Sequence, residues 1–279
     1  MVSLLIAILC SLLIAITLKF SETRHGERSV VIGTNYVVAA VFGVIMAKGF
    51  TPATHWMWTV FSIAVGIGRV FGMAIQMHAM KKLGLAITVS VARIASIGPV
   101  VGSIIFYGEN PSKIQVLGIT MGLASFIILG LAQREHHHGD DAHKDLFAIG
   151  LLACVFVVIA LNDFATKVAQ EGEIDKGFFL LLAFTTSAIL CWTWAVARRK
   201  PLNSRDFILG AFLGVPNFWG SYFAIIALHE LGGIVVFPTL SASGVVTATF
   251  AAILLWKERP NRRAWVGIIL AAFAVVLLG

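Results

Sequence analysis

The stretch AAILLWKERPNRRAWVG, residues 251–267, gathers charged side chains inside an otherwise apolar sequence. A second stretch, GSIIFYGENPSKIQVLG at residues 102–118, has the same arrangement with most of the positive charge removed. At an offset of 149 residues, the two stretches align Glu109 with Glu258, Pro111 with Pro260 and Gly118 with Gly267. We interpret them as equivalent connections between helices in two copies of one unit.

The composition outside these connections is that of a membrane protein. The chain has 279 residues, of which 58% are hydrophobic and 13% charged, and its mean hydropathy is +0.91. A helix crosses ~30 Å of hydrocarbon with roughly 20 apolar residues. Ten runs of suitable length are present: 1–18, 29–47, 55–79, 85–107, 114–132, 146–166, 177–197, 207–228, 232–256 and 264–279. The few remaining residues exclude a soluble catalytic domain.

The match between the two stretches extends along the chain. At an offset of 148, further pairs align: Lys19 with Lys167, Arg28 with Lys176, Gly66 with Gly214, Gly72 with Gly220, and Leu83-Gly84 with Leu231-Gly232. We therefore predict two five-helix repeats, 1–132 and 146–279, joined by a polar His-rich linker at 133–145. An odd number of spans inverts the second copy in the membrane, as in many secondary transporters. The expected fold is an all-α membrane protein of ten transmembrane helices in two inverted repeats.

The basic residues are distributed unevenly between the two sides that this topology defines. The connections after the first, third, fifth, seventh and ninth runs hold 15 Lys and Arg residues, whereas the other four hold 4. Short basic connections remain in the cytoplasm. We therefore expect both termini to be extracytoplasmic, in a prokaryotic plasma membrane, and the net charge of +7 requires no nucleic-acid partner.

Ten helices in two halves, each with an acidic residue and a proline in its fourth connection, resemble the drug/metabolite transporter superfamily, EamA type. The motifs are Gly108-Glu109-Asn110-Pro111 and Lys257-Glu258-Arg259-Pro260, each followed by a Gly-rich closing helix. The resemblance implies a carrier that moves small metabolites or drugs by alternating access, often as an exporter. Its better-known ten-helix members have cytoplasmic ends, which differs from the charge count here.

Ionisable residues deep in apolar helices are costly and mark substrate or ion pathways by default. Arg69 shares a helix face with Gln76, and its repeat partner is Asn217. The expected pathway residues are Asn35, Arg69, Gln76, Arg93, Asp163, Asn217, Trp219, Tyr222, Ser243 and Thr247. They place the cavity between the first, third, fourth, sixth, eighth and ninth helices. The fifth and tenth helices are a candidate homodimer contact.

Structural roles are the alternatives for these residues. The arginines can bind backbone carbonyls, Asp163 can pair with Lys167 one helical turn away, and hydroxyls often bond to their own helix. Pro99, Pro216 and Pro238 lie inside predicted helices, where we expect kinks. Glu109 and Glu258 are interpreted as loop residues rather than coupling carboxylates.

Two arginines against one aspartate favour a small anionic or zwitterionic metabolite, such as an amino acid, and we predict its export. The alternatives are a proton-coupled carrier for cations or drugs, and a structural or sensory membrane protein. Motifs for an enzyme are absent from the sequence. The linker residues His136–His138 with Asp140, Asp141 and His143 impose no ligand geometry, so we expect neither a metal nor a cofactor.

Overall fold

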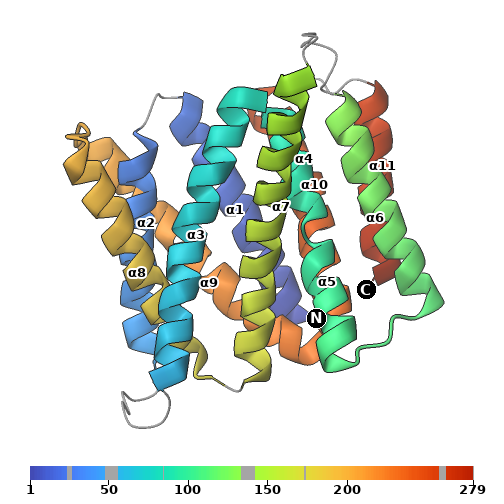
Figure 1. The fold of residues 1–279 in the computed structure, drawn as a ribbon, viewed down its shortest axis with the longest axis horizontal. Coiled ribbons are helices and arrows are strands. Elements are labelled where there is room, and N and C mark those ends of the chain that lie inside the picture. The colour runs from blue at the N-terminus through green and yellow to red at the C-terminus, as the bar shows by residue number, and fades with distance from the viewer. Residues whose placement is uncertain are drawn as a thin grey trace. The chain divides into compact units, whose positions relative to one another are not determined.

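The computed structural model describes residues 1–23, 27–47, 56–83, 85–132, 142–172, 174–257 and 262–278, and these form α-helices and their connections (Figure 1). The helices are α1 (Val2–Thr23), α2 (Arg28–Met46), α3 (Trp56–Leu83), α4 (Leu85–Ile94), α5 (Ile97–Tyr107), α6 (Lys113–Ala132), α7 (Ala142–Glu171), α8 (Lys176–Ala197), α9 (Ser204–Leu231), α10 (Gly233–Trp256) and α11 (Arg262–Leu278). Each of the ten apolar runs therefore coincides with a helix or a pair of helices.

The fourth run divides into α4 and α5, and Pro99 explains the division. Proline has no N–H to donate to the carbonyl four residues earlier, which here belongs to Ala95. The Gly98 N–H bonds to that carbonyl instead, at 3.0 Å, and the Ser96 hydroxyl donates to Arg93 O at 2.9 Å. The kink expected at Pro99 is thus a helix break, whereas Pro216 and Pro238 lie inside the continuous helices α9 and α10.

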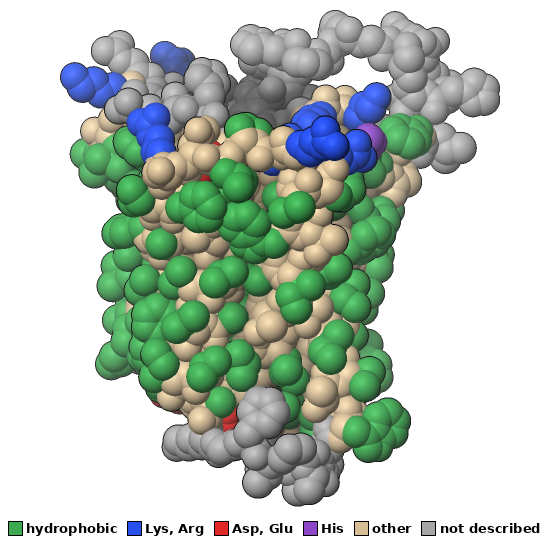
Figure 2. Space-filling view, turned by 90° about the vertical axis from the view of Figure 1, so that its left-hand side faces the viewer, with side chains coloured by type: hydrophobic (Ala, Val, Ile, Leu, Met, Phe, Trp, Pro, Cys, Tyr) green, Lys and Arg blue, Asp and Glu red, His purple; other side chains and the backbone are tan. Residues whose placement is uncertain are grey.

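The helices have the length and composition of membrane spans. Six of them, within the described residues, carry apolar windows long enough to cross a membrane, and four shorter apolar helices accompany them. Hydrophobic side chains dominate the face drawn in Figure 2. Many of these are large and exposed, such as Leu254 at 76% and Val276 at 75%. In water such a surface would be unstable, so the chain is an all-α membrane protein.

The helices form two compact units, and each unit draws helices from both predicted repeats. Unit 1 comprises residues 1–70 and 168–230, and unit 2 comprises residues 71–167 and 231–279. In unit 1, α2 packs against α8. In unit 2, α6 packs against α11, and α10 packs against α5, α6 and α11. The long helices α3 and α7 each contribute residues to both units.

Glycines set how these helices pack and show in which direction they run. A Cβ at Gly43 would lie 2.7 Å from Leu181 Cα, and one at Gly33 would lie 3.1 Å from the Trp192 ring, so α2 and α8 are antiparallel. Gly118 faces Leu278 and Gly122 faces Ala274, so α6 and α11 are antiparallel too. Such small residues allow backbones to approach closely where no hydrophobic effect drives helices together.

Candidate functional site

In unit 2, one face of α7 carries two ionisable residues, Asp163 and Lys167. Asp163 and Lys167 are four residues apart and so lie on the same side of the helix. On the same stretch of α7, α5 approaches closely: a Cβ at Gly98 would lie 2.5 Å from Ala160 Cβ, and one at Gly102 would meet the Phe164 ring. The glycines of α5 therefore allow its backbone to pack closely against the face of α7 that carries Asp163 and Lys167.

Asp163 on this face acts on Arg93 at the end of α4. The aspartate is the charged group whose electrostatic attraction reaches the Arg93 guanidinium. The same guanidinium lies against α10, where a Cβ at Gly244 would be 3.0 Å from one of its terminal nitrogens. Arg93 thus links α4, α7 and α10, and Gly244 provides the space it occupies.

Lys167, one turn further along α7, pairs with a carboxylate from the α5–α6 connection. Lys167 Nζ lies 2.8 Å from Glu109 Oε1, although the lysine side chain is only 2% exposed. Glu109 Oε1 also accepts from the Gly233 N–H at 2.9 Å, and Oε2 accepts from the Ile234 N–H at 3.0 Å. The carboxylate therefore caps the N-terminus of α10, where free backbone N–H groups favour negative charge.

This contact keeps Glu109 ionised and depends on two glycines. Burial alone would raise the pKa of Glu109, but the hydrogen bonds from Gly233, Lys167 and Ile234, with the charge of Lys167, lower it overall. Gly232 has φ +77°, and a Cβ there would lie 3.0 Å from Glu109 Oε2. A Cβ at Gly233 would overlap Ser103 Oγ. Larger residues at either position would displace the carboxylate or the hydroxyl.

In unit 1, two asparagine side chains form a hydrogen bond next to a cluster of aromatic rings. Asn217 Nδ2 on α9 donates to Asn35 Oδ1 on α2 at 3.0 Å. Beside Asn217, an aromatic cluster surrounds Phe218, whose ring centroid lies 5.7 Å from Phe42, 5.4 Å from Trp219 and 5.8 Å from Tyr222. This combination offers hydrogen-bonding amides next to flat apolar faces.

Arg69, in the part of α3 that belongs to unit 1, lies over an aromatic ring. Its guanidinium carbon is 4.9 Å from the centroid of Phe184 on α8, a cation–π distance. Tyr36 stacks on the same ring, with centroids 5.9 Å apart. Nearby, the buried Ser187 hydroxyl donates to Gly66 O at 3.0 Å and ties α8 to α3.

The structure distributes the predicted site residues over the two units. Unit 1 brings together Asn35 with Asn217 and Trp219 with Tyr222, and unit 2 brings together Arg93 and Asp163. Gln76 is partly exposed on α3. Ser243 Oγ donates to Thr239 O at 2.5 Å and Thr247 Oγ1 to Ser243 O at 2.8 Å, so both hydroxyls bond within α10.

The ion pair between Glu109 and Lys167 was not predicted from the sequence, although the repeat alignment contained a signal for it. Lys167, Glu109 and Gly232 all occupy positions that the repeat alignment pairs with a residue of the same type. Their counterparts Gly84 and Glu258, and the linker histidines 136–138, lie outside the described residues. Within the described residues, no cluster of His, Cys, Asp and Glu could hold a metal ion.

Known proteins are similar to this chain in sequence and in fold. Residues 146–279 match the EamA-like transporter family. The chain is 24% identical over 286 residues to an uncharacterized protein of Haemophilus influenzae, covering 99% of this chain and 97% of that protein. It is 23% identical over 252 residues to the "Probable glucose uptake protein GlcU" of Staphylococcus aureus, covering 84% and 83%.

A crystal structure of another protein has the same fold, with a TM-score of 0.78, 17% identity, and coverage of 99% of this chain and 95% of that one. The apolar helices, the family match and the bacterial relatives agree on one assignment. Residues 146–279 match the model of the EamA-like transporter family, and the chain is an integral membrane transporter of the bacterial plasma membrane.

Proposed function

We propose that the chain is a secondary-active carrier with ten membrane spans in two inverted repeats, 1–132 and 146–279, joined by the linker 133–145. Helices that the repeat alignment makes equivalent are antiparallel in two packed pairs, α2 with α8 and α6 with α11. In an inverted repeat, a pseudo-twofold axis in the membrane plane gives equivalent helices opposite directions. We propose alternating access, in which this symmetry relates the two open states of the carrier.

We also propose that both termini are extracytoplasmic. In unit 1, five basic residues lie where α2 and α9 begin and α8 ends: Arg28, Arg198, Arg199, Lys200 and Arg205. The opposite ends of α2 and α8 meet at Met46 and Gly177, where Lys176 is the only described basic residue. The positive-inside rule assigns the basic end to the cytoplasm.

For the substrate, we propose a small neutral solute rich in hydroxyl groups, such as a sugar. The electrostatic attraction between Arg93 and Asp163 supports this choice. A guanidinium whose charge is balanced by a carboxylate is a neutral set of strong donors and acceptors rather than a receptor for an anion. In unit 2, Ser103 Oγ, Asn162 Oδ1 and Thr239 Oγ1 are buried without a hydrogen-bond partner in the described residues, and a hydroxyl-rich solute could supply one.

Unit 1 supports the same substrate class by different means. The amide pair Asn35–Asn217 beside Trp219 and Tyr222 offers hydrogen bonds next to apolar ring faces. The Staphylococcus aureus relative carries the words glucose uptake in its name. We therefore propose uptake of a sugar in place of the amino acid export expected from the sequence, with Arg93 and Asp163 of unit 2 as contacts to the solute.

The test is flux of labelled glucose into proteoliposomes. We expect saturable uptake by the wild type, and a loss of at least tenfold in Arg93→Ala and in Asp163→Ala. Asp163→Asn tests the proton-coupled alternative. If Asp163 carries protons, this substitution should abolish uptake driven by a pH gradient and leave facilitated exchange intact. No uptake of labelled glucose, together with saturable uptake of a labelled amino acid by the same proteoliposomes, would overturn the sugar assignment and restore an anionic or zwitterionic substrate.

A further inference from the structure

The end of α8 and the start of α9 carry four basic side chains within eight positions: Arg198, Arg199, Lys200 and Arg205. The three arginines are exposed and Lys200 is half-buried. A basic run at a helix end can be explained by its effect on membrane topology alone. Three features of its surroundings indicate a more specific role.

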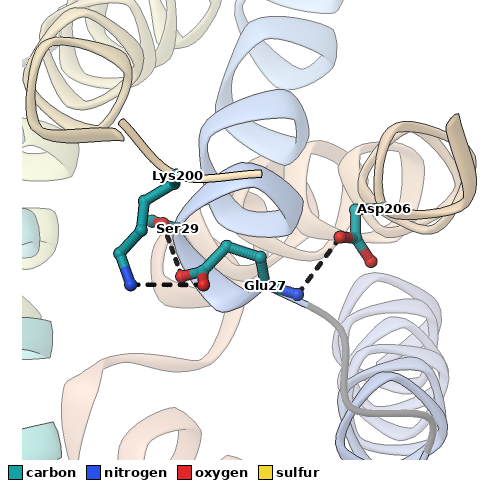
Figure 3. A network of polar contacts seen from close by, with 4 residues as sticks. All are labelled: Glu27, Ser29, Lys200 and Asp206. Atoms are coloured by element: carbon teal, nitrogen blue, oxygen red, sulfur yellow. Dashed lines mark hydrogen bonds and ion pairs between the residues drawn. The ribbon is translucent and has the colours of Figure 1, made fainter. Parts of the chain in front are cut away.

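First, the nearby acidic groups are already engaged, as Figure 3 shows. Glu27 Oε2 pairs with Lys200 Nζ at 3.2 Å, and Glu27 Oε1 accepts from the Ser29 hydroxyl at 2.8 Å. Asp206, only 2% exposed, accepts from the Glu27 N–H at 3.1 Å. Both carboxylates thus bind inward and hold the α8–α9 connection against the start of α2. Within the described residues, neither pairs with Arg198, Arg199 or Arg205.

Second, Arg199 occupies a backbone conformation that favours glycine. Its φ is +48°, in the left-handed region that is unfavourable for residues with a Cβ. It lies at the end of α8, where Lys200 N–H donates to Ala195 O at 3.0 Å and Arg199 N–H to Val196 O at 2.9 Å, which is the Schellman arrangement. Gly108 and Gly232 fill the corresponding left-handed positions at other connections.

The other described non-glycine residue with positive φ is also basic. Lys257, with φ +55°, directly follows α10. Two helix ends therefore tolerate backbone strain and retain a positive charge, where glycine would relieve that strain. An unfavourable conformation that persists at a functional site indicates that its side chain is needed.

Third, Arg198 contacts an exposed tryptophan at the end of α8. Its guanidinium carbon is 4.7 Å from the ring centroid of Trp194, a cation–π contact, and this tryptophan is 56% exposed. Exposed tryptophans near helix ends sit at the membrane–water interface. The ring therefore places the Arg198 charge next to the phosphates of the surrounding bilayer.

From these features we propose that Arg198, Arg199 and Arg205 form a binding site for the phosphate of an anionic phospholipid headgroup. Guanidinium groups bind phosphate oxygens in a bidentate manner, and clusters of Lys and Arg next to a membrane span attract anionic lipids. The Glu27–Lys200–Asp206 network holds the connection that carries the arginines. A lipid is favoured over a soluble anion because the interfacial Trp194 borders the site. The proposal is independent of which solute the carrier moves.

The experiment compares the purified protein in nanodiscs of phosphatidylcholine alone and of phosphatidylcholine with phosphatidylglycerol. Lipid bound per protein is measured by native mass spectrometry, and thermal stability is measured in parallel. We expect phosphatidylglycerol to bind preferentially and to raise the melting temperature. Each Arg→Gln change at 198, 199 or 205 should weaken this preference by about fivefold. Lys113→Gln, at the exposed start of α6, is the matched control and should leave the preference unchanged.

Arg199→Gly separates lipid binding from a merely structural role. Glycine relieves the backbone at this position, so in phosphatidylcholine we expect a melting temperature higher by roughly 2–4 °C, together with a weaker preference for phosphatidylglycerol. Equal phosphatidylglycerol binding by the triple Gln variant would overturn the proposal. Equal stabilisation by free inorganic phosphate in phosphatidylcholine nanodiscs would also overturn it, since the site would then recognise a soluble anion.

Discussion

Unit 1 and unit 2 accommodate polar side chains within apolar helices in different ways. In unit 1, Asn217 meets Asn35 at 3.0 Å, and the charge of Arg69 lies over the Phe184 ring at 4.9 Å. In unit 2, carboxylates face the cations: Glu109 lies 2.8 Å from Lys167, and Asp163 acts on Arg93. Unit 1 thus uses amides and aromatic faces where unit 2 uses opposite charges.

This difference determines how much stability the protein loses when one partner of a contact is removed. Removing one member of a buried ion pair leaves a charge in a poorly solvated place, which is strongly destabilising. Removing one member of an amide pair or a cation–π contact forfeits only a modest interaction. We therefore expect substitutions in unit 2 to have larger effects than those in unit 1, and the predictions below test that order.

The largest effect is expected from Glu109→Ala. The change removes the carboxylate that faces Lys167 Nζ, itself 2% exposed, and leaves the Gly233 and Ile234 N–H groups without their acceptor. Loss of one partner of a buried ion pair costs about 3–5 kcal/mol. The free energy of unfolding in detergent micelles, from denaturant titrations, measures the effect.

Lys167→Met provides the control for this substitution. If the cost of Glu109→Ala arises from the buried lysine, the double variant Glu109→Ala with Lys167→Met should recover a substantial part of the lost free energy. A double variant that loses as much as the sum of both single changes would show that the two side chains act independently. The ion pair would then not explain the role of Glu109.

The pH dependence of unit 2 is the second prediction. Because hydrogen bonds and Lys167 lower the pKa of Glu109, its contribution is complete above the ordinary carboxyl pKa of about 4.3 and is lost as the pH falls through its lowered value in the folded protein. The difference in unfolding free energy between wild type and Glu109→Gln should therefore shrink below about pH 4. For Asn217→Ala in unit 1, the same difference should be independent of pH. A constant difference for Glu109→Gln down to pH 3 would contradict this assignment.

Asn35→Ala is expected to have an intermediate effect. Asn35 is 4% exposed and accepts from Asn217, and interhelical hydrogen bonds in membrane proteins contribute about 0.6–1.7 kcal/mol. The free energy of unfolding should fall by about 1 kcal/mol, and Asn217→Ala should cost nearly the same. A loss as large as that of Glu109→Ala would remove the distinction between the two units.

The contact between Arg69 and Phe184 should contribute less. Phe184 also stacks with Tyr36 and meets Phe218 at a tilt, so Phe184→Leu alone measures packing as well as the cation–π contact. A double-mutant cycle with Arg69→Met isolates the pair, and we expect a coupling energy of about 0.5–1 kcal/mol. A coupling energy near zero would mean that the ring only fills space beneath the arginine.

Much of the helical architecture could be predicted from the sequence, because apolar runs of span length are a local signal. The runs 177–197 and 232–256, for example, nearly coincide with α8 (Lys176–Ala197) and α10 (Gly233–Trp256). Pro99 also predicted a disturbance of the fourth run. The complete break into α4 and α5 was not predicted, since proline alone does not determine whether a helix bends or ends.

The partners of the candidate site were less predictable, because they depend on contacts between distant segments. Spacing along α7 suggested Asp163 as a partner for Lys167, since residues four apart on a helix are neighbours. Lys167 forms an ion pair with Glu109, 58 residues away in the chain, which spacing along α7 could not indicate. Periodicity places a residue on a helix face, but it does not identify which other helix covers that face.

The smallest effect is expected from Ser243→Ala in α10, which the sequence had suggested as a pathway residue. The hydroxyl donates to Thr239 O within its own helix, and such bonds contribute little because that carbonyl already belongs to the helical ladder. We expect a change in unfolding free energy within about 0.5 kcal/mol and unchanged glucose flux in proteoliposomes. Thr247→Val, which removes a similar bond to Ser243 O, should behave in the same way. A tenfold loss of flux in Ser243→Ala at unchanged stability would instead show that this hydroxyl turns from its helix to bind the solute, and α10 would join Arg93 and Asp163 as part of the substrate contact.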